Sequence, residues 1–383
     1  MKGLLRDERG MALAIAIFAM VVIGALVAGA FFAGTQEQRV GENQRRVYQS
    51  FGAAEAGAQE RVMSWVPDQM NRRPQYPQDS VAIGNRASTH GTGRYSGHSY
   101  KAGPNVFLID VTGQDSRTSS GSIAGGGGAR QRIGLLARIA PIEFGIRASL
   151  TTQGGVSVGG NAQVNGADQI PTPWTSCDPP GPAQAGVRDN GGTVTTGGNG
   201  SVTGNPPVVN DPTIRDSTFT TFGGATFAQL AARANIVIPP GTYTTDPVVT
   251  NGVCDKTVIT NWGDGDNPTA PCGNYFPIIY ATGEITLNNT QGQGILLVNG
   301  NLNIQGSYQF YGIVIIQGDL KTAGGGTTEA HFWGGVMAKN ADLSVQNLSG
   351  KATLNFSSCS ILAALQAQSP ISMMRSRGWV QLY

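Results

Sequence analysis

The longest apolar run of the chain lies close to its N-terminus. Met11 to Gly34 are 24 consecutive residues without a charge, and a short charged leader that includes Lys2, Arg6 and Arg9 precedes them. As a helix this run would be about 36 Å long, which is enough to cross a bilayer. The apolar stretch of a cleavable secretory signal has only about 7 to 15 residues, so the run predicts a membrane-spanning helix instead.

The charges beside this run do not decide its orientation. Three Lys or Arg residues precede it, and Arg39, Arg45 and Arg46 follow it, so the positive-inside rule is balanced. Because most of the 383 residues follow the run, we expect a single-pass topology with a cytoplasmic N-terminus and an exported body.

A helical pattern continues beyond Gly34. Apolar residues recur at steps of three, four or seven, with charged residues between them. These positions are Val40, Val47, Phe51, Ala54, Ala58, Val62 and Trp65. We therefore expect one continuous helix over 11–66, about 84 Å long and ended by Pro67. Its six glycines, Gly24 to Gly57, each cost about 1 kcal/mol relative to Ala, which indicates close helix packing or local melting.

Three features of this region carry a family resemblance. A short leader ends in Glu8-Arg9-Gly10, an uninterrupted apolar helix begins at Met11, and the run Phe51-Gly-Ala-Ala-Glu-Ala-Gly57 follows. The combination resembles the N-terminal region of type IV pilus minor pilins of the PilX type. The resemblance implies cleavage by a prepilin peptidase after Gly10, methylation of the new N-terminus at Met11, and packing of the helix among those of other pilins.

One position departs from the family pattern. Most pilins carry Glu at the fifth mature position, where this chain has Ile15. In the family that Glu neutralises the N-terminal ammonium of the subunit ahead, inside a core where an unpaired charge is costly. The departure fits a rare or tip-located subunit, and the alternative is a single-span anchor that is never cleaved.

The segment after the helix has a weaker pattern. Residues 68–101 are polar and Pro-rich without a clear period, so we expect an irregular connection there. Two apolar runs, 106–111 and 133–139, predict a hairpin that packs on the outer half of the helix, with a long tip that contains Gly125 to Gly128. The expected organisation is a leader (1–10), the helix (11–66), the connection with its hairpin (67–150) and a final domain (151–383).

The final domain contains internal repeats. Four segments align without gaps from positions 277, 294, 312 and 335, so their starts are 17, 18 and 23 residues apart. Such a unit can bury its inner face only by stacking on the next one, and the period is that of one coil of a parallel β-helix. Residues 155–161 and 192–199 look like weaker early coils. The alternative is a set of unrelated hairpins in a sandwich.

The predicted fold class is therefore mainly β with one long N-terminal α-helix, a pilin-like stalk followed by a right-handed parallel β-helix or solenoid-like body. The repeated turns, Phe332 to Val336 and Arg377 to Leu382 also resemble the domain that follows PilX-type N-terminal regions. Composition agrees with a β-rich body, since 55 residues are Gly and only 13% are charged. The net charge of +2 does not indicate nucleic-acid binding.

All four cysteines lie beyond the apolar helix. On the exported side of a membrane, Cys177, Cys254, Cys272 and Cys359 should form two disulfides, and three pairings are open. We favour Cys254 with Cys272, which closes a short turn-rich interval, and Cys177 with Cys359.

The repeat alignment places four polar residues in one column. These are Glu284, Asn301, Asp319 and Asp342. Because neighbouring coils lie about 4.8 Å apart, the carboxyl groups of Asp319 and Asp342 could approach within about 5 Å, as in retaining glycosidases. The simpler explanation is that Asn and Asp follow a Gly turn for reasons of turn geometry.

Other candidate sites are weaker. Asp264, Asp266 and Asn267 offer alternating oxygen ligands that would suit calcium, but the later Glu of an EF-hand is missing, so an acidic turn is the alternative. The three histidines, His90, His98 and His331, lie in no metal or nucleophile pattern. We expect no cofactor, with calcium as the one possibility.

The sequence thus predicts a non-enzymatic minor pilin that acts in pilus assembly or surface adhesion. A more specific form of this prediction places it at the tip of the pilus. It would begin in the bacterial inner membrane and end in a pilus on the cell surface. The alternative is a membrane-anchored β-helix enzyme, or an adhesin, acting on extracellular polysaccharide.

Overall fold

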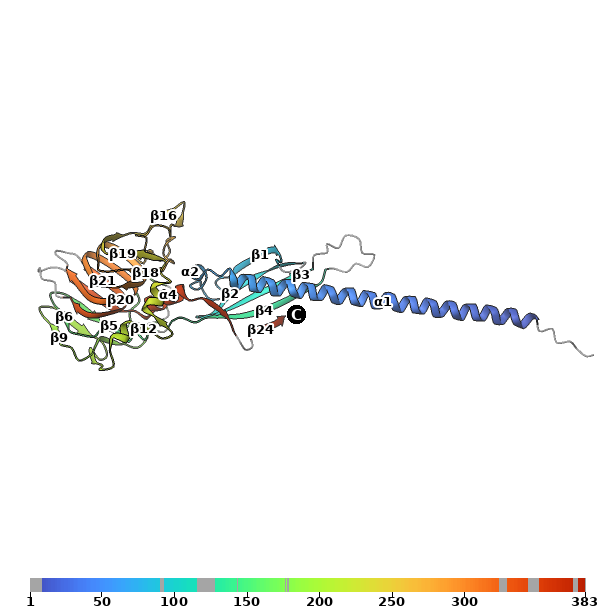
Figure 1. The fold of residues 1–383 in the computed structure, drawn as a ribbon, viewed down its shortest axis with the longest axis horizontal. Coiled ribbons are helices and arrows are strands. Elements are labelled where there is room, and N and C mark those ends of the chain that lie inside the picture. The colour runs from blue at the N-terminus through green and yellow to red at the C-terminus, as the bar shows by residue number, and fades with distance from the viewer. Residues whose placement is uncertain are drawn as a thin grey trace, which may run out of the picture.

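The computed structural model describes residues 9–89, 93–115, 128–142, 144–175, 177, 179–323, 329–343, 351–374 and 378–382. Its longest element is α1 (Arg9–Met63), a single helix of 55 residues that projects from the rest of the molecule (Figure 1). The predicted helix over 11–66 therefore ends three residues earlier, and the short helix α2 (Pro67–Met70) begins at the proline expected to stop it.

The outer end of α1 packs on an antiparallel sheet of six strands. Four consecutive strands form most of it, and two strands from the C-terminus complete it by pairing with β4. They are β1 (Val81–Ala87), β2 (Arg94–Gly103), β3 (Val106–Gln114), β4 (Arg130–Ile139), β23 (Ile371–Met373) and β24 (Trp379–Leu382). We call α1 with this sheet the stalk.

Two expectations about this region were wrong. The supposed irregular connection over 68–101 contains most of α2, all of β1 and most of β2. Six of the seven residues of β1 are not buried, so the strand carries little of the alternation that reveals strands in a sequence. The C-terminal strands belong to the stalk, although the predicted boundary placed them in the solenoid. Residues 116–127, which include most of the predicted hairpin tip, lie outside the described residues.

The body is a stack of parallel strands around one interior, as the repeats predicted. Most coils contribute to three walls, and the right-handed sense stays a prediction. Wall 1 contains β14 (Ile236–Ile238), β18 (Ile278–Ala281), 295–298 of β19 (Ile285–Val298), 313–316 of β20 (Leu302–Ala323), 335–338 of β21 (Glu329–Asp342), β5 (Ala148–Thr152), β8 (Ala185–Asp189) and β11 (Val208–Asn210).

The other two walls use the remaining parts of the same coils. Wall 2 contains β15 (Gly241–Thr245), 285–288, 302–305, 319–321, 340–342, β6 (Val156–Val158) and β9 (Val194–Thr196). Wall 3 contains 290–293, 308–311, 330–333, β22 (Lys351–Phe356), β7 (Gln163–Asn165) and β10 (Ser201–Thr203).

The coils do not stack in chain order. The last coil of the repeat array pairs with the first coil of the body, through Val336 with Leu150 and Leu354 with Val164. The early coils predicted at 155–161 and 192–199 exist, and their strands β6 and β9 pair with each other. They lie beyond the last repeat, however, and the chain then returns to the opposite end at β14 and β15.

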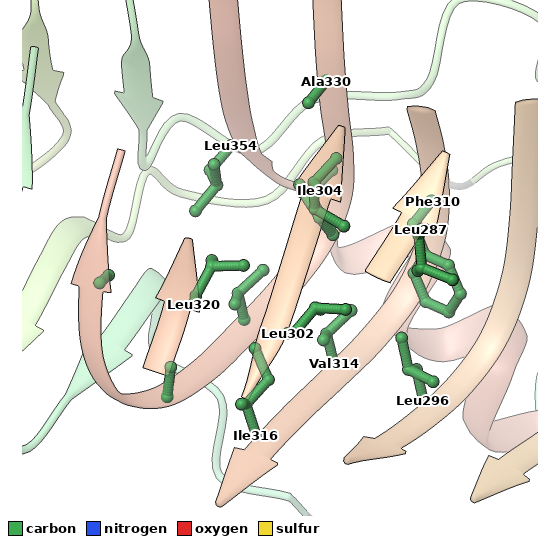
Figure 2. Close-up of a cluster of buried hydrophobic side chains, with 14 of the residues drawn as sticks. Leu287, Leu296, Leu302, Ile304, Phe310, Val314, Ile316, Leu320, Ala330 and Leu354 are labelled. Carbon is green, nitrogen blue, oxygen red and sulfur yellow. The ribbon is translucent and has the colours of Figure 1, made fainter. Parts of the chain in front are cut away.

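Large aliphatic side chains fill the space between the walls. Figure 2 shows Leu287, Leu302, Ile304, Val314 and others converging from neighbouring coils, and all of these are fully or almost fully buried. Wall 1 is also covered on its outer side, by η1 (Asp216–Phe219), β12 (Thr221–Phe222), β13 (Ala225–Thr226), α3 (Phe227–Ala231) and α4 (Ser358–Gln368). Burial of both faces explains why 295–298 and 313–316 are uninterrupted apolar runs, as in buried parallel sheets.

Contacts around α2 and α4 join the stalk to the body. Asn71 Nδ2 donates to the carbonyl oxygens of Gln366 and Ser369, at 2.6 and 2.9 Å. The Arg72 guanidinium lies 4.2 Å from the centroid of the Phe276 ring, and burial lowers the pKa of Arg72 to about 10. The two parts are therefore joined by buried polar and cation–π contacts rather than by a bare linker.

Candidate functional site

The helix α1 has two halves with different surroundings. From Ala53 to Ala58, four alanines are buried against the sheet of the stalk, and a Cβ on Gly57 would lie 2.5 Å from the ring of Tyr95. A Cβ on Gly113 of β3 would lie 2.0 Å from the carbonyl oxygen of Ser50. The small residues of the run 51–57 thus have a local function, because they let the helix and the sheet approach closely.

A carboxylate adds a polar attachment on the same face. Tyr95 donates its hydroxyl hydrogen to Glu60, and the backbone N–H of Thr89 donates to Glu60 Oε1 at 3.2 Å. Burial, followed by the hydrogen bond to Glu60, raises the pKa of the Tyr95 hydroxyl. The sheet is thus attached to one defined face of α1.

The other half of α1 has no such cover. Every residue from 12 to 34 is exposed, and the large apolar side chains there are 38% to 77% exposed. Full burial of one such side chain is worth about 1.5–3 kcal/mol, so this surface requires an apolar environment outside the chain. The helix is long and apolar enough to cross a membrane.

The predicted processing site lies where this helix begins. Gly10 and Met11 fall within the first residues of α1, and the leader up to Glu8 lies outside the described residues. Ile15, at the position of the family's Glu, is 66% exposed on the apolar surface. Cleavage after Gly10 and methylation at Met11 stay predictions.

The polar column on the body has a different membership from the predicted one. Glu284, Asn301 and Asp319 are joined as expected: Asn301 Nδ2 donates to Glu284 Oε2 at 2.8 Å, and the Asp319 N–H donates to Asn301 Oδ1 at 3.0 Å. The next member is Asn340, whose Nδ2 donates to Asp319 Oδ1 at 2.8 Å. Asp342 is paired with Lys321 instead.

The alignment error comes from the fourth repeat. Gly312 pairs with Gly334 rather than with Gly335, and the ladder shifts its register again between Ile316 and Asp319. The first change is an offset of one residue in the chosen alignment, and the second could not be shown by any alignment without gaps. Asp319 and Asp342 are therefore diagonal neighbours on adjacent strands, not direct ones as predicted. The residue positions of diagonal neighbours lie about 7–8 Å apart, against about 5 Å for direct neighbours.

Asp319 and Asp342 nevertheless line one open groove of about 290 Å³ on wall 2. Lys321 and Asn340 lie beside them. Further lining comes from Ser157 of β6 and Thr195 of β9, and from Gly155 and Thr193, the residues that directly precede these strands. The residues from β6 and β9 were not predicted as site residues, because they reach this place only through the stacking of the first coil on the last.

The acidic turn is built as a hydrogen-bonded structure. Asp264 Oδ1 accepts from the N–H and Nδ2 of Asn267, each at 3.1 Å, and from Gln291 Nε2 at 2.9 Å. Asp266 Oδ1 accepts from the Tyr311 hydroxyl at 2.6 Å. One oxygen of each carboxylate thus accepts hydrogen bonds from the protein itself, which favours the acidic turn, the alternative given above, and calcium binding stays a prediction.

Burial shifts the pKa values of Asp266 and Tyr311, which are hydrogen-bonded to each other. The main effect on Asp266 is desolvation, which raises the pKa of its carboxyl. Desolvation, and then the hydrogen bond to Asp266, raises the pKa of the Tyr311 hydroxyl. In both groups, burial thus makes the charged form less favourable than it is in water.

The cysteines form the two disulfides favoured from the sequence, Cys177–Cys359 and Cys254–Cys272. His98 stacks on Tyr100 with a centroid distance of 5.9 Å, and His331 Nε2 lies 2.8 Å from Glu329 Oε2, whereas His90 lies outside the described residues. Within the described part of the chain, no three His, Cys, Asp or Glu side chains gather as a metal site would require.

Comparisons with known proteins add little to this picture. No protein-family model matches the chain, and no curated protein matches it significantly. Among solved structures, the competence-associated pilin ComZ from Thermus thermophilus is similar, with 13% sequence identity and a TM-score of 0.29, over 88% of this chain and 97% of that chain. A TM-score this low carries no argument about the fold or the function.

Proposed function

We propose that this chain is a minor pilin, a low-abundance subunit of a type IV pilus or of a related pseudopilus. The observation that carries the proposal is the exposed apolar half of α1, continuous with a half that is firmly packed on a sheet. Such a helix can exchange the acyl chains of a bilayer for the helices of neighbouring subunits, because both surround it with apolar groups. The resemblance of residues 8–62 to PilX-type minor pilins supports the same assignment.

The lack of an acidic residue at Ile15 bears on the position of the subunit. A subunit without this carboxylate cannot neutralise the N-terminal ammonium of the subunit ahead of it, and an unpaired charge in a filament core is destabilising. We therefore place the chain at or near the tip, where no subunit lies ahead. Labelling of intact filaments with an antibody to the body should then mark their ends, whereas labelling along the whole length would contradict a tip location.

The mature N-terminus tests the central proposal. Mass spectrometry of the chain from sheared surface filaments should find a methylated Met11 as its first residue. Gly10→Val should block cleavage and keep the chain in the membrane fraction. Gly3→Val, a matched change within the leader, should leave cleavage and the release of the chain into filaments unchanged. The proposal would be refuted, in favour of a permanent anchor, if the wild-type chain kept Met1 and the chain were absent from sheared filaments.

We propose that the body has no catalytic activity. The alternative is an enzyme that acts on extracellular polysaccharide, and it is favoured by one observation, the presence of Asp319 and Asp342 in the same groove. Replacing both aspartates with Asn distinguishes the enzyme from a body without catalytic activity. Loss of glycan hydrolysis with normal pilus number would support the enzyme, and equal product release by the wild type and the variant would remove it.

A further inference from the structure

The groove on wall 2 lies at the end of the molecule that faces away from the apolar helix. Its lining comes from four successive strands of the stack, which are the end of β20, the end of β21, β6 and β9. Figure 1 shows β6 and β9 at the end of the body opposite to the projecting part of α1. A body held at the surface by α1 would present this groove to the surroundings.

The groove has a floor that belongs to the core. Val156 and Ala341 line the groove and, like Leu320 between Asp319 and Lys321, are part of the buried cluster of the body, where each is at most 3% exposed. Side chains that stand on paired strands above a packed core keep their positions better than side chains on loops. The polar groups above this floor are therefore held in a fixed arrangement before any ligand arrives.

Register fixes the order of the polar groups along the groove. Lys321 is paired with Asp342, Asp342 with Ser157, and Ser157 with Thr195. With about 4.8 Å between strands, this row of an ammonium, a carboxylate and two hydroxyls is about 14 Å long. Asp319 and Asn340 lie beside it, held to each other by their hydrogen bond.

The hollow results from a difference in side-chain size along the row. The longer side chains of Lys321, Asn340 and Asp342 stand at one end, while next to them Gly155 has no side chain and Ser157 a short one. The volume of about 290 Å³ is close to the lower limit of about 300 Å³ for ligand pockets. A ligand that lies across the strands would fit this shape better than one that enters a deep hole.

The chemistry of the lining selects among possible ligands. Two carboxylates accept hydrogen bonds, one ammonium and one amide donate them, and the hydroxyls do both. The lining has a formal charge of −1, which disfavours anionic ligands, and the ammonium of Lys321 opposes a simple cation site. A neutral molecule with many hydroxyl groups matches this set, because each hydroxyl can donate to a carboxylate and accept from the ammonium or the amide.

We propose that this groove binds a short segment of a neutral oligosaccharide and does not cleave it. The inference goes beyond the proposed filament function, since it concerns what the displayed body recognises. The residues that line the groove include no aromatic ring that could stack on a sugar, so we expect weak affinity at a single groove. Several copies, or several sugar segments on one surface, would then be needed for firm attachment.

Titration of the purified full chain tests this inference. The chain would be kept in a zwitterionic detergent without a sugar headgroup and titrated by calorimetry with neutral hexamers of glucose, galactose, mannose and N-acetylglucosamine, and with a galacturonic acid hexamer. At least one neutral hexamer should bind, the acidic hexamer should bind more weakly, and salt should have little effect because the ligand is uncharged. No binding by any neutral hexamer, tighter binding of the acidic one, or release of shorter products would overturn the proposal.

Three variants and one control locate the binding. Asp319→Asn and Asp342→Asn should each weaken it about fivefold to tenfold, because hydrogen bonds to charged groups are stronger than those to neutral ones. Ser157→Trp should abolish it by filling the hollow. Asp216→Asn, an equal charge change on the cover of wall 1, should leave it unchanged. Binding that survives all three groove variants would place the ligand elsewhere. The purified chain is used, so a failure of the filament proposal would not affect this result.

Discussion

The two disulfides close loops of very different length, and this difference can be measured. Cys177–Cys359 has a sequence separation of 182 residues, and Cys254–Cys272 one of 18. In the chain-entropy treatment, a crosslink stabilises the fold by restraining the unfolded chain, by an amount that grows with the logarithm of loop length. The longer loop is then worth about 5 kcal/mol and the shorter one about 3 kcal/mol.

The surroundings of the long-range bridge make it a suitable test. Hydrogen bonds already join the two chain segments beside it: the Ser358 N–H donates to Asp168 Oδ1 at 2.8 Å, and the Gln169 N–H donates to the Phe356 carbonyl at 3.0 Å. The native contacts should therefore persist when the bridge is removed. The variant should act mainly through the unfolded chain.

The assay is denaturant unfolding of the full chain in detergent, followed by near-ultraviolet circular dichroism. The double variant Cys177→Ser with Cys359→Ser should lose about 2 kcal/mol more than Cys254→Ser with Cys272→Ser. Double replacement leaves no unpaired thiol from the broken bridge. An equal loss, or a larger loss for the short loop, would refute the loop-length argument and would mean that the bridges act on the native state.

Three further predictions concern packing and charge. Gly57→Val should destabilise the stalk by about 1–3 kcal/mol, because its side chain would meet the ring of Tyr95, and proteolysis of the sheet should report this. Asp266→Asn should raise the free energy of unfolding at pH 7. Burial raises the pKa of the Asp266 carboxyl, so the protein loses stability as pH rises and this buried group becomes charged, and Asn carries no charge. Hydrogen bonds from Thr213, and then one from Arg188, lower the pKa of Asp211 to about 2, so its contribution is present above about pH 4 and is lost as pH falls toward 2. Thermal unfolding at several pH values should show this acid-side loss in the wild type and not in Asp211→Asn.

Each of these predictions has a result that contradicts it. Gly52→Val is the control for the packing change, since a Cβ there has no neighbour within 4 Å, and equal losses for the two glycines would exclude a specific contact. Lower stability of Asp266→Asn at pH 7 would mean that the hydrogen bond from Tyr311 outweighs the burial of the charge. An unchanged acid-side loss in Asp211→Asn would assign that loss to other carboxyl groups.

Features that repeat locally could be predicted from the sequence. A helix shows its period within a few turns, and 24 uncharged residues followed by apolar steps of three and four led to α1 with an error of two or three residues at each end. A solenoid coil shows its inward positions every second residue, so the four coils and the first two intervals between them were visible, whereas the third interval was wrong by one residue. The favoured cysteine pairs are the ones that form, although sequence spacing supported only the short-range pair, Cys254–Cys272.

The order of the stack and the composition of the groove required the tertiary structure. The open edge of one parallel coil offers the same backbone groups as the edge of any other, so nothing local in β6 or β22 shows that the first coil pairs with the last. The same limit applies to β23 and β24, which pair with β4 more than 200 residues earlier. Sequence by itself determined the apolar helix and the repeating coil, because the period of an element follows from its own backbone. Only the tertiary structure decided which coils are neighbours, and therefore that Asp342 lies between Lys321 and Ser157, because pairing between distant edges depends on the whole chain.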